Sequence, residues 1–164
     1  MLTQKTVREL FDYYPNTGFL FWKADAYVYG LKGKRAGALR KKDGYRTIQI
    51  DGVRYQEHRI IWLFIYGDIK IKTIDHINHI RHDNRIINLR LVTPLESNLN
   101  QSKNSNNKSG CNGVHWFKTY NKWVAQLTIN YKKKHLGYYV DWFDAVCARK
   151  SAEVKYGFHP NHGK

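Results

Sequence analysis

Cysteine is scarce in this sequence, which is 164 residues long and contains only Cys111 and Cys147. The two lie far apart and form no Cys-x-x-Cys pair. The sequence therefore argues against a cysteine-rich zinc site and gives no support to a disulfide framework. This use of cysteine fits the reducing environment of the cytoplasm.

Long apolar runs are also missing. No run approaches the roughly 20 apolar residues that cross a bilayer, and the first residues lack the apolar core of a signal peptide. No basic amphipathic helix is evident, which weakens the case for a protein that lies on a membrane surface. We therefore expect a soluble protein without a membrane partner.

Acidic residues are few. The sequence contains 13 Asp and Glu and 28 Lys and Arg, which gives a net charge of +15. Such an excess of positive charge favours a polyanionic partner, and nucleic acid fits better than a membrane surface. A hydrophobic content of 42% argues for a folded chain. The length allows one ordinary domain or two small ones.

The N-terminal part predicts a series of short elements. A capping-box pattern begins a helix at Thr6, and period-two alternation around Asp51-Gly52 predicts a β-hairpin. The apolar run that ends at Gly67 predicts a buried helix with a glycine stop. The expected elements are a helix over 6–13, a turn over 15–18, a strand over 19–22, a loop over 24–39, hairpin strands over 45–50 and 53–56, and a helix over 58–66.

A basic segment runs from residue 32 to residue 46, where seven Lys or Arg stand against one acid. Lys41, Lys42 and Arg46 are therefore candidate contacts to DNA phosphates. A solvated surface loop would have the same composition, so both interpretations stay open here.

The stretch from Asp75 to Asn98 carries the residue types of a hydrolytic site. A carboxylate at Asp75 precedes an imidazole at His76, and amides follow at Asn88, Asn98 and Asn100. Carboxylate and amide oxygens suit one hard divalent cation, and an imidazole can take a proton from water near neutral pH. This set of residues is typical of a nuclease.

The same region resembles a known family. The runs similar to the signature of HNH homing endonucleases of phages and mobile introns are Glu57-His58-Arg59-Ile60-Ile61-Trp62, Ile74-Asp75-His76-Ile77-Asn78, Asp83-Asn84-Arg85 and Asn88-Leu89-Arg90-Leu91-Val92-Thr93. The resemblance implies a small ββα-metal unit, with a first strand over 71–77 and a helix after Asn88 that includes 94–100. It also implies action in the cytoplasm of a bacterial or phage-infected cell.

The resemblance implies a role for each residue of the site. His76 would be the general base, and Asn88 would orient the His76 ring and the loop around it. Asp75 and Asn98 would bind one divalent metal ion, Mg²⁺ or Mn²⁺. Arg85, inside the motif, is a candidate DNA contact.

The second metal ligand has alternatives. The family usually places this amide nine residues after the position of Asn88, where this chain has Ser97. An insertion of one residue would restore the role to Asn98, but Asn100 or Glu96 would also serve.

Three histidines, His76, His79 and His82, are spaced by three residues and raise the question of zinc. Their neighbours are rich in oxygen donors and no thiolate partner is near in the sequence, which favours magnesium or manganese. We expect His79 and His82 to contact DNA or solvent.

The C-terminal third predicts a linker and a second small fold. Residues 100–110 are rich in Asn, Ser and Lys and have too little apolar surface to pack. Beyond them, strands are expected over 113–117, 122–130 and 135–139, and a helix over 142–156. In the middle strand, alternation predicts that Ala125 and Leu127 pack under the helix while Val124 faces outward.

These elements, with Gly113-Val114, Trp123-Val124-Ala125 and Leu136-Gly137 in place, resemble the plant APETALA2 DNA-binding domain. That family inserts its sheet into the major groove. The positions that match the contact residues of the family are His115, Phe117, Gln126, Thr128, Lys133 and His135.

Together these features predict an α+β chain in four parts. The parts are a basic DNA-contacting region over 1–44, an HNH unit over 45–100 that includes the hairpin and helix, a linker over 101–110, and an APETALA2-like three-stranded antiparallel sheet with a helix over 111–164. The predicted function is a metal-dependent DNA endonuclease, nicking or site-preferring, that acts on double-stranded DNA as a monomer or weak dimer. The alternative is a DNA-binding regulator with a degenerate HNH unit.

Overall fold

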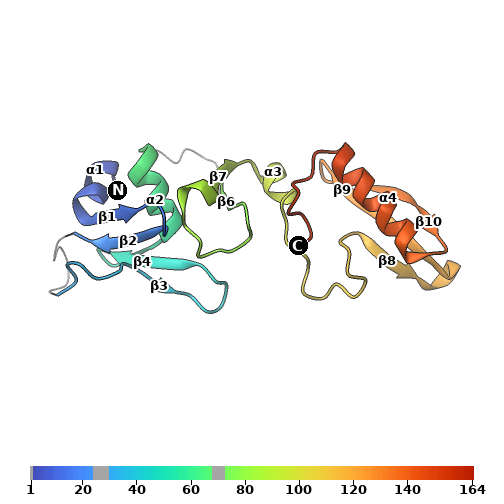
Figure 1. Ribbon diagram of the computed structural model, residues 1–164, viewed down its shortest axis with the longest axis horizontal. Coiled ribbons are helices and arrows are strands. Elements are labelled where there is room, and N and C mark those ends of the chain that lie inside the picture. Colours follow the sequence, from blue (N-terminus) through green and yellow to red (C-terminus); the bar gives the residue numbers. More distant parts are fainter. Residues whose placement is uncertain (1, 24–29, 68–72) are drawn as a thin grey trace. The chain divides into compact units, whose positions relative to one another are not determined.

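The computed structural model describes residues 2–23, 30–67 and 73–164 of the chain. The chain divides into two compact units, Met1–Pro94 and Leu95–Lys164. Each unit combines helices with small antiparallel sheets, which confirms the predicted α+β class (Figure 1). Within the described ranges, no helix has both the length and the apolar character needed to cross a bilayer.

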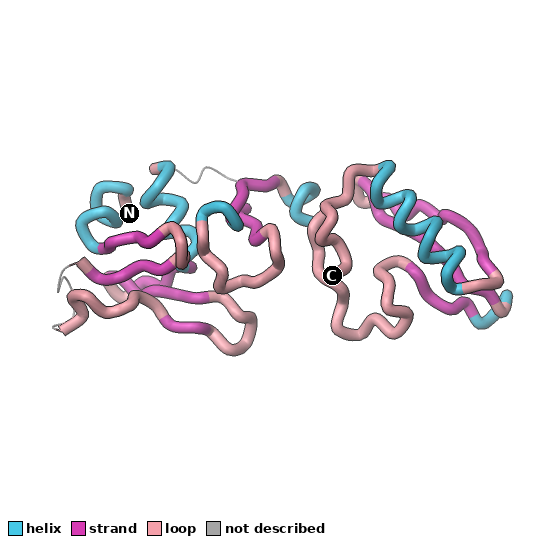
Figure 2. Tube along the Cα trace, viewed as in Figure 1, coloured by secondary structure: helices cyan, strands magenta, loops and turns pink. Residues whose placement is uncertain are grey.

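The first unit contains three small antiparallel sheets, formed by β1 with β2, by β3, β4 and β5, and by β6 with β7 (Figure 2). Its elements are α1 (Gln4–Leu10), β1 (Phe11–Tyr14), β2 (Phe19–Trp22), β3 (Ala38–Leu39), β4 (Arg46–Ile50), β5 (Val53–Gln56), α2 (Glu57–Tyr66), β6 (Thr73–His76), the 3-10 helix η1 (Ile86–Asn88) and β7 (Leu89–Val92). The predicted hairpin is confirmed by the pairing of β4 with β5. The predicted stop of α2 is confirmed too, since Gly67 caps the helix with a φ of 78°.

Two elements of the first unit differ from the expectation. The N-terminal helix is capped by the side chain of Thr3 and ends at Leu10, because β1 pairs with β2 immediately after it. After Asn88 the chain forms strand β7, paired with β6, before the short helix α3 (Pro94–Asn98) begins. Residues 24–29 of the expected loop and 71–72 of the expected strand lie outside the described residues.

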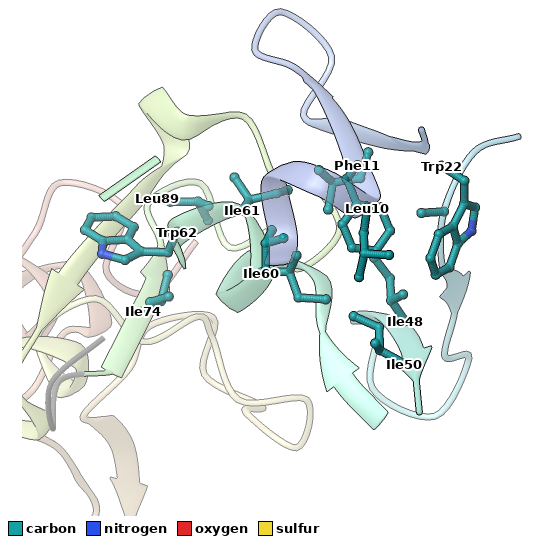
Figure 3. Close-up of a cluster of buried hydrophobic side chains, with 13 residues drawn as sticks. Leu10, Phe11, Trp22, Ile48, Ile50, Ile60, Ile61, Trp62, Ile74 and Leu89 are labelled. Atoms are coloured by element: carbon teal, nitrogen blue, oxygen red, sulfur yellow. The ribbon is translucent and has the colours of Figure 1, made fainter. Parts of the chain in front are cut away.

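Helix α2 lies in the middle of the hydrophobic core of the first unit (Figure 3). Ile60 and Ile61 are buried at its centre, and Trp62 lies on the side of the β6–β7 hairpin. The core residues labelled around them are Leu10, Phe11, Trp22, Ile48, Ile50, Ile74 and Leu89. The hairpin that carries Asp75 and His76 is therefore packed onto the same core as the N-terminal elements.

The second unit is a three-stranded antiparallel sheet with one helix across a face, as predicted (Figure 1). Its elements are β8 (Val114–Phe117), the 3-10 helix η2 (Lys118–Tyr120), β9 (Lys122–Ile129), β10 (Lys132–Tyr139) and α4 (Trp142–Lys155). Asp141 caps α4 by accepting a hydrogen bond from the amide of Phe143.

The middle strand follows the predicted alternation with one exception. Ala125 and Leu127 are buried, as expected for residues under α4. Val124, expected to face outward, is also buried at 5% exposure. Its register partners are His115 on β8 and Tyr138 on β10, so large neighbours flank it on the outer face.

The expected linker is part of the second unit. The amide of Lys103 donates to the carbonyl of Lys164, and the amide of Gly163 donates to the carbonyl of Gln101. Ser109 Oγ donates to the carbonyl of Val114, on β8. The segment therefore obtains through hydrogen bonds the order that its apolar content could not supply.

Candidate active site

Asp75 and His76 end strand β6 and, as neighbours on a strand, point to opposite faces. Asp75 lies opposite Arg90 in the register, and Arg90 Nη2 is 2.9 Å from Asp75 Oδ2. His76 is turned inward and is 4% exposed. The hairpin thus places one carboxylate and one imidazole side by side in the chain but in different surroundings.

Asn88 closes the loop between β6 and β7. Its side-chain oxygen accepts from the amide of Asn78 at 3.0 Å, and its side-chain nitrogen donates to the carbonyl of Asp83 at 2.8 Å. The amide of Ile77 also donates to the backbone carbonyl of Asn88. Asn88 therefore fixes the shape of the loop that leaves His76.

The His76 ring is held by a different amide. His76 Nε2 lies 3.0 Å from Oδ1 of Asn84, and Asn84 Nδ2 donates to Glu57 Oε2 at 2.9 Å. Glu57 is fully buried in the first turn of α2, and Arg46 Nε lies 2.9 Å from its Oε2. A buried series of polar groups thus runs from β4 through α2 to the ring.

The rings of His58 and Tyr45 lie against His76. His58 packs edge-on against it with ring centroids 5.0 Å apart, and Tyr45 lies against both histidines. The guanidinium of Arg81 stacks over the Tyr45 ring at 5.1 Å. These contacts restrict the rotation of the His76 ring.

Burial governs the ionisation of these groups. Burial lowers the pKa of His76, although the hydrogen bond to Asn84 and the charge of Asp75 oppose the shift. Burial lowers the pKa of His58 to about 3, with the neighbouring His76 adding to the effect. Burial raises the pKa of Glu57, and the guanidinium of Arg46 opposes that rise. Both histidines are therefore neutral near pH 7.

The N-terminal hairpin supports the Asn84 backbone. The Tyr13 hydroxyl donates to the carbonyl of Asn84 at 3.2 Å and accepts from the amide of Ile86 at 3.0 Å. Gly18, with a φ of 72°, approaches so closely that a Cβ there would lie 2.3 Å from the amide nitrogen of Arg85. Only glycine fits at this contact.

The predicted DNA contacts of the first unit have different environments. Lys41 and Lys42 are exposed between β3 and β4. Arg85 pairs with Asp83, at 2.6 Å, and its guanidinium holds the pKa of Asp83 at about 2. The Arg46 side chain is only 13% exposed and donates to the carbonyl of Gly37 besides pairing with Glu57. In these surroundings the Arg46 guanidinium pairs with the buried Glu57 carboxylate beneath the site.

The predicted second metal ligands all belong to the segment after Pro94. Asn98 is exposed at the end of α3, and its side-chain oxygen accepts from Gln101. Asn100 is 3% exposed, and Glu96 is exposed on α3. Among residues 2–23, 30–67 and 73–164, no group of three or more His, Cys, Asp or Glu could hold a metal ion. The choice among these three ligands stays a prediction.

The predicted DNA-facing residues of the second unit share one face of its sheet. Register pairs place Gln126 beside His135 and Thr128 beside Lys133. His115 and Phe117 lie on β8 at alternate positions, opposite Val124 and Lys122. Because paired residues of antiparallel strands point to the same side, all six lie on the face opposite α4.

Glu57, Asn84 and Tyr13 were not assigned a role from the sequence. Asn84 lies inside a run that resembles the HNH signature, and Glu57 begins another such run. The sequence therefore contained a hint that both residues belong to the site. Their contact joins positions 27 residues apart, which no local pattern reveals. No sequence pattern that we identified pointed to a role for Tyr13 at the site.

Comparison with known proteins finds similarity in the part of the chain that carries this site. Residues 55–99 match the sequence model of the HNH endonuclease family. Over 69 residues the chain is 41% identical to an uncharacterized HNH endonuclease of Acanthamoeba polyphaga mimivirus, a match that covers 41% of this chain and 36% of that protein.

A solved structure of DNA binding and cleavage by the HNH homing endonuclease I-HmuI is also similar, with 25% identity and a TM-score of 0.38. That match covers 51% of this chain and 46% of the other. The chain therefore spans less than half the length of each of these two relatives, 36% and 46%. The segment that carries Asp75, His76, Asn84 and Asn88 thus matches the HNH endonuclease family, and this match supports a nuclease function.

Proposed function

We propose that this protein is a metal-dependent DNA endonuclease that hydrolyses phosphodiester bonds with His76 as the general base. The observation that carries the proposal is a neutral His76 ring, held by Asn84, directly after the Asp75 carboxylate within the family match. A neutral imidazole accepts a proton, whereas a charged one cannot.

A divalent cation fits the donor chemistry of the site. The Asp75 carboxylate is 15% exposed, and an amide oxygen of Asn98 or Asn100, or the Glu96 carboxylate, would complete a set of hard oxygen ligands. Mg²⁺ or Mn²⁺, when bound, would neutralise charge on the phosphate. Because Arg90 already pairs with Asp75, the cation would compete with a guanidinium for that carboxylate.

The residues of the chain would accept the proton, orient the base and hold the loop. His76 removes a proton from the attacking water, and the rings of His58 and Tyr45 keep the imidazole in one orientation. Asn88 holds the loop that follows. One such site per chain cuts one strand, so a monomer would nick and a double-strand cut would need a dimer or a second event.

DNA would be bound mainly through its phosphates. Lys41 and Lys42 offer exposed positive charge in the first unit, and Arg85 would contribute after exchanging Asp83 for phosphate. In the second unit, the sheet face with His115, Gln126 and Lys133 would enter the major groove as in the APETALA2 family. There Gln126 suits adenine edges.

Incubation of supercoiled plasmid with the full chain tests the proposal. We expect nicked product with Mg²⁺ or Mn²⁺, and no product with EDTA or with the His76→Ala variant. Cleavage that persists in His76→Ala would overturn the assignment of the base. Gel shifts without cleavage under every metal condition would instead support a DNA-binding regulator.

A further inference from the structure

Asn84 is 1% exposed and its amide lies between two buried groups. Its nitrogen is 2.9 Å from Glu57 Oε2 and its oxygen is 3.0 Å from His76 Nε2. We propose that Glu57, acting through Asn84, fixes His76 as the tautomer that carries its proton on Nε2 and its lone pair on Nδ1. Glu57 and Asn84 are then positioning residues.

The direction of each hydrogen bond follows from what the groups can donate. The Arg46 guanidinium lies 2.9 Å from Glu57 Oε2, so this carboxylate is paired with a cation and accepts only. Asn84 must therefore present its NH₂ group to Glu57 and its oxygen to His76. An oxygen requires a donor, so the neutral ring carries N–H at Nε2, which leaves the lone pair on Nδ1.

The surrounding structure prevents Asn84 from moving away. Glu57 is fully buried on helix α2, which packs in the core. The backbone of Asn84 is held by the Tyr13 hydroxyl and faces the close approach of Gly18. With both ends fixed, reversal of the amide would place two donors or two acceptors against each other.

This role differs from that of Asn88, whose side chain bonds the backbone of the loop at Asn78 and Asp83. The assignment of the tautomer stands on hydrogen-bond geometry alone. Its consequence for cleavage rests on the proposed nuclease function, in which Nδ1 is the atom that accepts the proton from water.

The tautomer can be measured directly in the wild-type protein by ¹⁵N NMR of the histidine rings, with the His76 signals assigned from a His76→Gln spectrum. We expect a protonated Nε2 and an unprotonated Nδ1 on His76. A proton on Nδ1, or a mixture of tautomers, would overturn the inference.

A pair of variants tests the part played by Glu57. Glu57→Met has a similar length but no acceptor, so Asn84 can reverse and the tautomers should mix. Glu57→Gln retains an accepting oxygen and should keep more of the Nε2–H form than Glu57→Met. For cleavage we expect Glu57→Met to lower kcat by about tenfold or more with KM for DNA little changed. Glu9→Gln, an exposed carboxylate on α1, is the control.

Rescue separates positioning from folding. In the double variant Glu57→Met with Asn84→Asp, residue 84 has two accepting oxygens and cannot present a donor to the ring. We expect it to restore the Nε2–H tautomer at alkaline pH and to recover part of kcat. If Glu57→Met does not fold, Asn84→Ala takes its place, and an unchanged His76 tautomer in that variant would contradict the inference.

The two claims fail in different ways. If the wild-type protein shows the Nε2–H tautomer but never cleaves DNA, the nuclease proposal fails and the positioning of His76 stands. If the wild type cleaves and Glu57→Met cleaves equally fast with the same tautomer, the positioning role fails and the nuclease proposal stands.

Discussion

His58 shows most clearly how burial sets the chemistry of a single residue in this protein. It is 4% exposed, packs on His76, and has its pKa lowered to about 3. In the unfolded chain the same side chain titrates near 6.5. Between these two pKa values the unfolded state binds more protons than the folded state. The contribution of His58 to the free energy of unfolding is therefore fully present above the unfolded pKa and is lost as the pH falls towards the folded pKa.

We therefore expect the free energy of unfolding to fall as pH drops below about 6.5, by up to about 1.4 kcal/mol per pH unit for His58. Urea unfolding across this pH range measures the slope. The His58→Phe variant keeps a ring against His76 and cannot titrate, so its slope should be smaller. An equal slope in both proteins would show that His58 is not the group responsible.

At the scale of elements, the Tyr13 hydroxyl bonds the β1–β2 hairpin to the loop that carries Asn84. The Tyr13 hydroxyl donates a hydrogen bond to the Asn84 carbonyl and accepts one from the Ile86 amide. Tyr13→Phe removes both bonds at constant shape. We expect a loss of about 1–3 kcal/mol in unfolding free energy and slower cleavage.

Tyr14 provides a matched control on the same strand. Its side chain is 54% exposed, so Tyr14→Phe should change neither stability nor cleavage. Urea unfolding and plasmid nicking, measured on both variants, decide the matter. Equal effects from the two substitutions would contradict the support that we assign to β1–β2.

Helix α4 contains a buried ion pair, and the arginine of that pair also bonds to the sheet. Arg149 Nε donates to Glu153 Oε1 at 2.8 Å and Nη1 donates to the carbonyl of Gln126 at 2.7 Å, while His162 lies against Nη2. Arg149→Leu leaves the buried Glu153 carboxylate with the half-exposed Lys150, 2.7 Å away, as its remaining lysine or arginine partner among the described residues, and we expect a loss of about 3 kcal/mol.

Replacing both residues should cost less than replacing Arg149 alone, because the buried carboxylate that lost its arginine is then removed and the remaining charge, on Lys150, is half-exposed to water. Thermal unfolding of Arg149→Leu and of Arg149→Leu with Glu153→Leu makes the comparison. A double variant that is less stable than the single one would show that the pair itself, with its bond to Gln126, contributes more than its desolvation costs.

The sequence predicted elements where local signals agreed and missed them where a distant partner decided. The apolar run before Gly67 predicted α2, and Asp51-Gly52 predicted the β4–β5 hairpin. The β7 strand was missed because its pairing with β6 spans a long loop. The bond between Glu57 and Asn84 was out of reach for the same reason, whereas the pair Asp75-His76 was visible as adjacent letters.

At the scale of the whole molecule, a net charge of +15 would dominate the proposed interaction with DNA. Each phosphate contact releases counterions, so affinity should fall steeply as salt rises. Lys133 lies on the sheet face opposite α4, and Lys155 lies on α4 itself. Substitution of each lysine therefore tests whether DNA contacts the sheet side or the helix side of the second unit.

We expect Lys133→Ala to weaken DNA binding and to reduce the slope of log affinity against log salt by about 1. Lys155→Ala should leave that slope unchanged. Fluorescence anisotropy over a salt series measures both. A larger effect from Lys155 would place DNA on the helix side and contradict the proposed use of the sheet.

The most direct test of the central claim is a single-turnover measurement of plasmid nicking at saturating protein and Mn²⁺. Wild type and His76→Ala are compared at concentrations where both bind the DNA fully. With His76 as the general base, the rate should fall by about 100-fold or more while the DNA dissociation constant stays the same. A His76→Ala rate equal to that of the wild type would contradict the account.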